Sequence, residues 1–219
     1  MYLTRMELDT EKRNTMKAMI SPNLFHGAVE AAFPGKRTRK LWRIDKIRNH
    51  CYMLLLSDRE PLLDQAVKQF GIKGSMWETK NCDSLLDHIE QGTKWQFRLT
   101  ANPTRCVKNE PGKRGVVRAH NTPYFQKKWL MDRCKKWGFS VAEEDFVIRE
   151  ARWQKFYKGE IRNYPITILS VTFEGILTIS DSEIFKKTLT EGVGRGKAYG
   201  MGLLTVIKVR GEKSEAKRS

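Results

Sequence analysis

The stretch "SPNLFHGAVEAAFPG", residues 21–35, determines how the first part of the chain folds. Ser21 is suited to cap a helix and Pro22 to its first position, whereas Pro34 and Gly35 end it. Between these limits the apolar residues recur at helical spacing, at Phe25, Ala28, Val29, Ala32 and Phe33. The sequence therefore predicts an amphipathic helix with one buried face.

The segments around this helix predict a known arrangement. Residues 1–9 are expected to form a strand before it, and two strands follow at 40–49 and 51–58. A second helix is predicted over 61–71 and a further strand over 94–107. Strand, helix, strand, strand, helix, strand is the order of a ferredoxin-like unit.

A similar order follows in the second half of the chain. A helix over 122–139 is closed by Gly138, and a long hairpin is predicted over 145–180 with its turn at 158–163. A helix capped by Asp181 or Ser182 and a closing strand at 202–209 complete the list of elements. The second unit then has a missing or borrowed first strand.

The fold class expected is α+β, with two tandem ferredoxin-like, RRM-like domains built on antiparallel sheets. Residues 1–106 form the predicted N-terminal domain, and residues 107–210 the C-terminal domain with the basic hairpin and a glycine-rich loop. The linker is expected between Cys106 and Tyr124. The polar tail, residues 211–219, is expected to be disordered.

The charge of the chain indicates its partner. The formal net charge is +16, from 41 Lys and Arg against 25 Asp and Glu, so the partner is expected to be a polyanion. A ribosomal or membrane-surface protein would show the same excess. On the predicted hairpin, basic residues alternate with aromatic ones, a mixture that suits RNA. The basic residues expected to bind RNA in these segments are Arg37, Arg39, Arg43, Arg152, Lys155, Lys158 and Arg162. A charged run can also be no more than a solvated surface.

Other features narrow the class of protein. The four cysteines lie far apart and form no zinc-binding pattern, so reduced thiols are expected. The N-terminus has no signal-peptide pattern, and no apolar run approaches the roughly 20 residues that cross a bilayer. A cytoplasmic protein without a membrane partner is predicted.

The segment "EGVGRGKAYGMGLLTV", residues 191–206, has glycines at positions 192, 194, 196, 200 and 202. We call it the glycine loop, and its members are Gly192, Gly194, Gly196, Gly200 and Gly202. It fits neither the P-loop pattern nor the dinucleotide fingerprint, which disfavours an ATP site. Its amides, together with Arg195 and Lys197, are expected to meet a phosphodiester chain. The alternative is a tight connection whose glycines only permit positive φ.

Of the four histidines, His26 has the most informative position. It lies beside the apolar stripe of the predicted helix, about one turn from its start. The helix dipole there favours a neutral imidazole, the form that a general base needs near pH 7. The competing interpretation is an ordinary surface or core histidine.

Taken together, these residues resemble the CasE family, CRISPR repeat-RNA endoribonucleases of type I-E systems within the RAMP superfamily. The motifs that carry the resemblance run in the family's order from residue 1 to about 206. They are "MYLTR", "LFHGAVEAAFP", "FRLTANPTR", "KWLMDRCKKWGF", "VTFEGILTISD" and "GVGRGKAYGMGLLTV".

The resemblance implies binding of the repeat stem-loop in precursor transcripts and one cut at the 3′ base of the stem. It implies no metal and no cofactor, with His26 as general base or acid and products ending in a 2′,3′-cyclic phosphate and a 5′-hydroxyl. It also implies that the protein keeps its crRNA as a Cascade subunit, contacts other Cascade subunits, and is a monomer when isolated.

The chain departs from the family in two places. Asn23 stands where the family often has a catalytic Tyr three residues before the His, and an amide cannot transfer a proton. Thr100 replaces an Arg that is common before Ala-Asn-Pro. Two other hypotheses therefore stay open: a catalytically weak or inactive RNA-hairpin-binding subunit of the same complex, and an unrelated basic RNA-binding protein such as a ribosome-associated factor.

Overall fold

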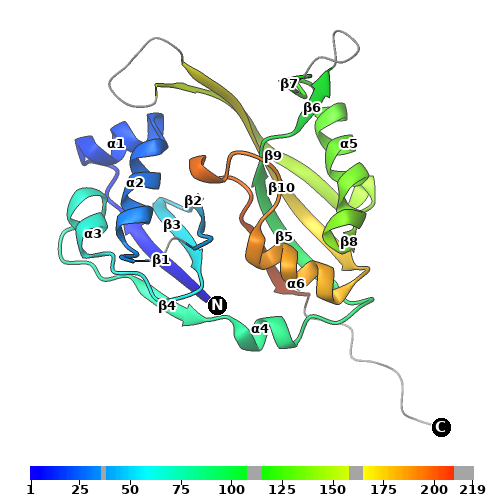
Figure 1. Ribbon diagram of the computed structural model, residues 1–219, viewed down its shortest axis with the longest axis horizontal. Coiled ribbons are helices and arrows are strands. Elements are labelled where there is room, and N and C mark those ends of the chain that lie inside the picture. The colour runs from blue at the N-terminus through cyan, green and yellow to red at the C-terminus, as the bar shows by residue number, and fades with distance from the viewer. Residues whose placement is uncertain (36–37, 108–114, 158–164, 210–219) are drawn as a thin grey trace.

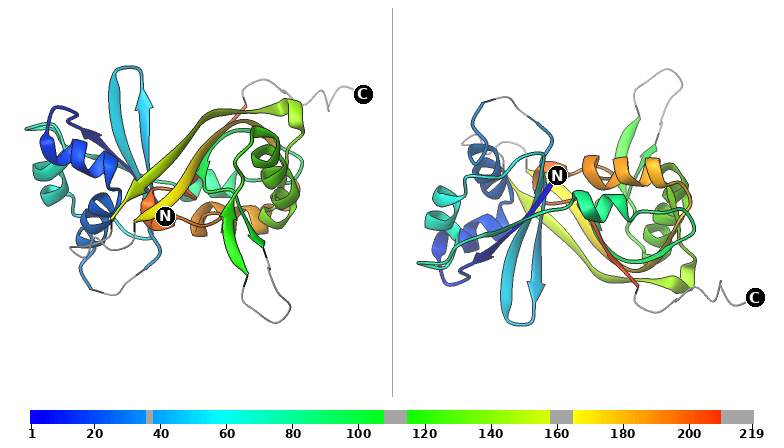
Figure 2. Two further views of the ribbon diagram at one scale, coloured as in Figure 1. Left: turned by 90° about the horizontal axis from the view of Figure 1, so that it is seen from above. Right: turned by 90° about the horizontal axis from the view of Figure 1, so that it is seen from below.

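The computed structural model describes residues 1–35, 38–107, 115–157 and 165–209. Two antiparallel sheets lie next to each other, and their helices lie on opposite outer sides of the molecule (Figure 1; Figure 2). We call the part up to residue 81 the first unit and the part from residue 94 the second unit.

The first unit has the predicted order of elements. Its sheet runs β2-β3-β1-β4 and is antiparallel throughout. The strands are β1 (Tyr2–Leu8), β2 (Leu41–Ile47), β3 (His50–Ser57) and β4 (Glu78–Asn81), and the helices α1 (Arg13–Ile20), α2 (Asn23–Ala31) and α3 (Asp64–Phe70). Helix α1 was not predicted, and the residue that precedes α2 is Pro22 rather than Ser21. Phe25, Val29, Ala32 and Phe33 are buried, which confirms the predicted apolar face.

The prediction that residues 94–107 form the last strand of the first unit is wrong. β5 (Lys94–Ala101) pairs with β10 and β11 in the second sheet, and β4 closes the first sheet instead. Every second side chain of β5 is buried in the core of the second unit: Trp95, Phe97, Leu99 and Ala101. Because β4 reads "ETKN" and is mostly exposed, it lacks the apolar alternation that identifies a strand.

The second unit is complete, since β5 is its first strand. Its sheet runs β11-β5-β10-β8, with β9 also on β10. The remaining elements are α4 (Asp83–Asp87), which links the two units, α5 (Pro123–Cys134), β8 (Phe139–Ser140), β9 (Phe146–Phe156), β10 (Ile166–Ile179), α6 (Ser182–Glu191) and β11 (Leu204–Lys208). The predicted hairpin is β9–β10, and the turn expected within it lies outside the described residues. Asp181 caps α6 as predicted, because its Oδ1 accepts from the Ile184 amide at 2.9 Å.

Both units therefore have the ferredoxin-like strand order, as the sequence predicts. The segment expected to be a linker instead contains a small hairpin, β6 (Thr104–Val107) with β7 (Val116–Ala119). We propose that the domain division follows the sheets, between Asn81 and Lys94, in place of a boundary at residue 106. The tail 211–219 lies outside the described residues.

A buried arginine joins the two units. Arg43 of β2 is 2% exposed and uses both sides of its guanidinium group. It donates to both carboxylate oxygens of Asp45, at 2.8 and 2.7 Å. On the second unit it donates to the carbonyls of Arg98 and Leu203, at 3.0 and 2.9 Å, and to the Thr205 hydroxyl at 2.9 Å. These five bonds occupy all the N–H donors of the group and hold the end of the glycine loop against β2.

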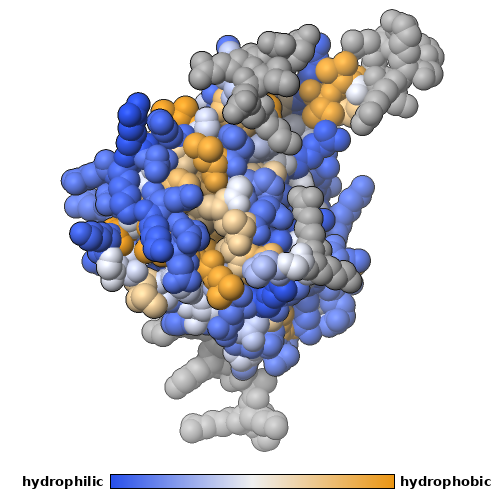
Figure 3. All heavy atoms as spheres, turned by 60° about the vertical axis from the view of Figure 1, so that its left-hand side comes forward, coloured by the Kyte–Doolittle hydropathy of each residue, from blue (hydrophilic) through white to orange (hydrophobic). Residues whose placement is uncertain are grey.

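The outer face of the first unit is hydrophilic over most of its area and carries a narrow band of apolar residues (Figure 3). The exposed large apolar side chains of α1 and α2 are Met16, Ile20 and Leu24. In the part of the chain that the structure describes, no helix is long and apolar enough to cross a membrane.

Candidate active site

His26 faces a shallow depression between the two units. It lies in the first turn of α2, and because Phe25 and Val29 point into the core, its half-buried ring lies beside the buried stripe. The residues that line this depression are His26, Glu30, Thr38, Arg39, Lys40, Lys197 and Ala198. We call it the His26 depression; it gathers one imidazole and several cations from both ends of the chain.

Lys197 enters the depression from the second unit, at the start of the short 3₁₀ helix η3 (Lys197–Tyr199). Burial lowers the pKa of Lys197, the positive charge of Arg39 lowers it further, and Glu191 partly offsets both effects. A bound anion would favour the charged form of this lysine. The pair formed by Lys197 and Arg39 is therefore suited to hold a phosphate beside His26.

The glycine loop is a tight connection between α6 and β11. All five of its glycines have φ between +68° and +87°. A Cβ at Gly200 would lie 2.8 Å from the Trp42 ring, and one at Gly202 would lie 2.4 Å from the Val193 carbonyl oxygen. The Gly202 amide donates to the Thr100 carbonyl at 2.7 Å, and the Val193 amide donates to the Gly202 carbonyl at 2.9 Å. These two amides are used inside the protein and are not available to an anion. The loop places the Lys197 side chain at the depression, and contact of its other amides with an anion stays a prediction.

The other predicted basic residues fall into four groups. Arg39 lines the His26 depression, and Arg152, Lys155 and Arg195 are exposed. The prediction that Arg43 binds RNA is wrong. Its guanidinium group is buried and all its N–H donors are occupied, so no donor is left for RNA. Its charge was counted in a basic run, whereas its burial follows from the contact between the units. Arg37, Lys158 and Arg162 lie outside the described residues.

Asn23 lies one helical turn before His26, at the start of α2. Its Oδ1 atom is buried and has no hydrogen-bond partner among the residues that the structure describes. Asn23 is not among the residues that line the His26 depression. The structure therefore gives it no visible part in proton transfer.

The remaining histidines lie elsewhere, and none of them lines the His26 depression. The His50 ring contacts Glu7 at 2.5 Å, and His88 contacts the Ser84 carbonyl at 2.6 Å. The His120 ring stacks on Phe125 with 5.9 Å between centroids. Among the described residues, no group of His, Cys, Asp and Glu is arranged to hold a metal ion.

Four residues that line the depression were not predicted as site residues: Glu30, Thr38, Lys40 and Ala198. Lys40 has an almost fully buried side chain whose Nζ lies 3.4 Å from Glu30 Oε2. It also lies over the Phe33 ring, 5.1 Å from the centroid. The sequence could have indicated Glu30, because it lies four residues after His26 and therefore on the same side of the helix.

Comparisons with known proteins identify the family and the fold of the chain. A family model described as "CRISPR associated protein" matches residues 1–208. The CRISPR-associated endoribonuclease Cse3 of Thermus thermophilus is 30% identical over 219 residues, covering 94% of this chain and 99% of the relative. The Cascade subunit CasE of Escherichia coli is 27% identical over 125 residues, covering 54% of this chain and 60% of the relative.

A solved structure of CRISPR endoribonuclease Cse3 bound to a 19-nucleotide RNA has the same fold. It superposes with a TM-score of 0.78 at 27% identity, covering 94% of this chain and 100% of the other. The family model spans nearly the whole chain, and the Thermus relative aligns over almost its full length. The chain therefore belongs to the CRISPR associated protein family, and within it to the CasE type that its motifs resemble.

Proposed function

We propose that this protein is a metal-independent endoribonuclease that binds the stem-loop of CRISPR repeat RNA and cuts it at the 3′ base of the stem. It then keeps the crRNA as a subunit of Cascade, in the cytoplasm. The observation that carries the proposal is the meeting of His26 with Lys197 and Arg39 in one depression. The relatives named as an endoribonuclease and as a Cascade subunit support it.

The proposed reaction needs two proton transfers and a place for negative charge. The ribose 2′-hydroxyl loses its proton and attacks the neighbouring phosphorus, and the bond to the 5′-oxygen of the next nucleotide breaks as that oxygen gains a proton. The products are a 2′,3′-cyclic phosphate and a 5′-hydroxyl. His26 performs one of the proton transfers, as base or as acid. Lys197 and Arg39 stabilise the charge that develops on the phosphorane.

The β9–β10 hairpin offers a surface for the stem. Arg152 and Lys155 are exposed on β9, and Trp153 between them is 54% exposed. Cations of this kind contact backbone phosphates, while an exposed indole can stack on an unpaired base. The RNA would then run from the hairpin toward the His26 depression.

The test is a cleavage assay in excess EDTA with the repeat RNA of the source organism. A single cut, absent when the nucleotide at the cut carries a 2′-deoxy sugar, is the expected result. Tight binding without a cut would favour the second candidate, an RNA-holding subunit, which the Asn at position 23 motivates. Cleavage that stops in EDTA would contradict the metal-independent reaction.

We expect Lys197→Ala to weaken RNA binding and to make it less dependent on salt. Loss of one phosphate contact lowers the slope of log K against log salt by about 0.7 to 0.9. Titrations at four salt concentrations measure this slope. Lys73→Ala, at an exposed position that does not line the depression, is the control. An unchanged slope would remove Lys197 from the interface.

Lys197 also predicts a pH dependence. Because its pKa is lowered, it loses its charge at a lower pH than an ordinary lysine. RNA affinity is therefore expected to fall as the pH rises through the alkaline range. In Lys197→Arg the fall should be absent, since the guanidinium stays charged. Equal pH profiles for the two proteins would contradict this assignment.

A further inference from the structure

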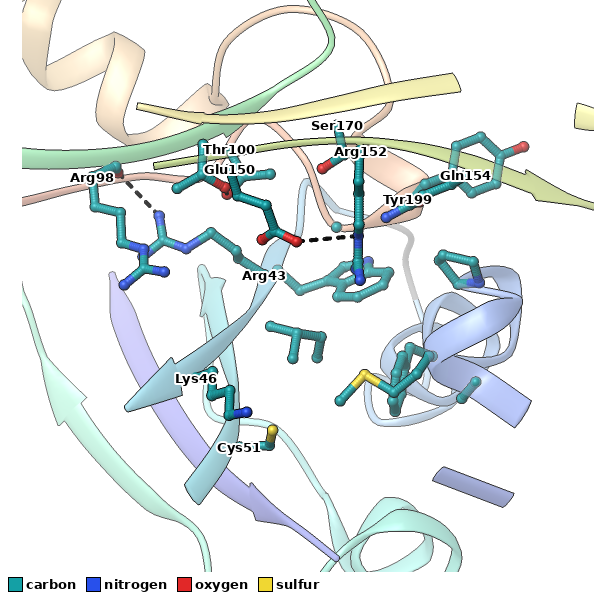
Figure 4. Close-up of a pocket in the computed structure, with 18 residues that line it drawn as sticks. Arg43, Lys46, Cys51, Arg98, Thr100, Glu150, Arg152, Gln154, Ser170 and Tyr199 are labelled. Atoms are coloured by element: carbon teal, nitrogen blue, oxygen red, sulfur yellow. Dashed lines mark hydrogen bonds and ion pairs between the residues drawn. The ribbon is translucent and has the colours of Figure 1, made fainter. Parts of the chain in front are cut away.

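A second space lies between the two units, and the residues of α2 and the glycine loop that line it differ from those that line the His26 depression. Its volume is about 230 Å³. We call it the interdomain hollow. Figure 4 shows Thr100, Arg152, Gln154, Ser170 and Tyr199 reaching it from the second unit.

The two sides of the hollow differ in chemistry. The first unit contributes an apolar wall that includes Met19, Pro22, Phe25 and Trp42, together with two cations, the buried Arg43 and the exposed Lys46. The second unit contributes the polar face of its sheet, because alternate residues of β5, β9 and β10 point away from the core that α5 and α6 cover. A flat ring with polar edges fits such a space, since its faces can pack on the wall while its edge meets the sheet.

Three buried polar atoms of the lining residues have no hydrogen-bond partner in the described part of the chain: Gln154 Oε1, Trp42 Nε1 and Arg98 Nε. The last of these lies 3.3 Å from Asp45 Oδ1 in an ion pair. The side-chain oxygen Oε1 of Gln154 and the indole Nε1 of Trp42 are both buried, and neither makes a hydrogen bond with the described part of the chain. By contrast, the hydroxyls of Thr100 and Thr172 bond each other at 2.9 Å. A buried acceptor and a buried donor left unpaired are unfavourable. Because neither atom has exposed surface, each side chain has to turn toward the hollow before a ligand that offers the complementary pair can satisfy both.

The hollow is next to the proposed catalytic site. On α2, Phe25 lines the hollow and the following residue, His26, lines the depression. On the glycine loop, Lys197 lines the depression, whereas Tyr199 lines the hollow. Neighbouring nucleotides of one RNA strand can therefore occupy the two spaces, with the scissile phosphate in the depression and a base in the hollow. The exposed Arg152 at the hollow has only a distant partner, Glu150 at 3.8 Å, and is available to a phosphate.

We infer that the interdomain hollow receives one unpaired base of the RNA, from a nucleotide next to the scissile phosphate, and that it selects adenine or cytosine. On their Watson–Crick edges these bases place an amino donor beside a ring-nitrogen acceptor, which complements Gln154 Oε1 and Trp42 Nε1. Guanine and uracil present an N–H at the ring nitrogen. The inference rests on the proposed function for its ligand, since it takes that base from the bound repeat RNA.

The experiment measures binding of uncleavable repeat RNAs that carry 2′-deoxy at the cut. One series replaces each unpaired nucleotide near the cut by an abasic site, and a second series places each of the four bases at the sensitive position. The variant is Gln154→Met, which keeps the chain length and removes the amide. The control is Gln96→Met, the same substitution on β5 of the same sheet, at a residue outside the hollow.

We expect the wild type and the control to lose about tenfold in affinity at one abasic position and to prefer adenine or cytosine there. Gln154→Met should show neither effect at that position. If no position is sensitive, or if Gln154→Met responds as the wild type does, the hollow holds only water and the inference is wrong.

Thermal unfolding checks each variant, and Gln154→Leu replaces Gln154→Met if the latter is unstable. The two proposals fail in different ways. An RNA with its 2′-hydroxyl intact that binds but is not cut contradicts the nuclease activity, while the abasic series still decides whether the hollow holds a base.

Discussion

Replacing His26 by alanine is expected to slow cleavage of the repeat RNA by about 10²- to 10⁴-fold. Among the described residues that line the depression, the His26 imidazole is the group suited to proton transfer near pH 7, apart from Glu30, which pairs with Lys40. RNA affinity should change little, because the cations that contact the phosphates remain. Single-turnover cleavage and equilibrium binding, measured on the same RNA, separate the two effects.

His88→Ala is the matched control. His88 is exposed after α4 and lies outside the depression, so its loss should leave the rate unchanged. Equal rates for the wild type and His26→Ala would exclude His26 from the chemistry. A parallel loss of rate and affinity would make it a binding residue instead.

Replacing Arg43 by alanine is expected to lower the free energy of unfolding by about 3 to 5 kcal/mol. The Asp45 carboxylate is 4% exposed and would lose its two closest donors, while the Leu203 carbonyl and the Thr205 hydroxyl would lose theirs. Urea unfolding of the full chain measures the change.

Arg5→Ala provides the comparison for this second substitution. Arg5 pairs with Glu78 at 2.9 Å, but both side chains are largely exposed, so this loss should cost less than about 1 kcal/mol. Similar values for Arg5→Ala and Arg43→Ala would show that the buried bridge contributes no more than a surface pair.

The elements that could be predicted are those with a strong local pattern. Three features follow from patterns among residues close together in the sequence: the apolar stripe of α2, the long β9–β10 hairpin and the Asp181 cap. All three are present in the structure. His26 was identified for the same reason, since its place beside that stripe is a property of one helix.

The predictions failed where the structure depends on contacts between residues that are far apart in the sequence. β4 and β5 can each follow α3 in a ferredoxin-like order, and the choice depends on pairing with β1 or with β10, which adjacent residues do not reveal. The burial of Arg43 likewise depends on Leu203 and Thr205, which lie near the other end of the chain. A charge count registers the guanidinium but not its surroundings.

The His26 depression is shared between two units, and this limits how the protein can be divided. Each unit has a full set of strands and a hydrophobic core of its own, and a smaller shared cluster packs Leu41 and Leu56 of the first unit against Leu203 of the second. Neither has both His26 and Lys197. On the proposed assignment of the site, the smallest piece of this chain expected to cleave RNA is therefore the docked pair, and either unit alone is expected to be inactive.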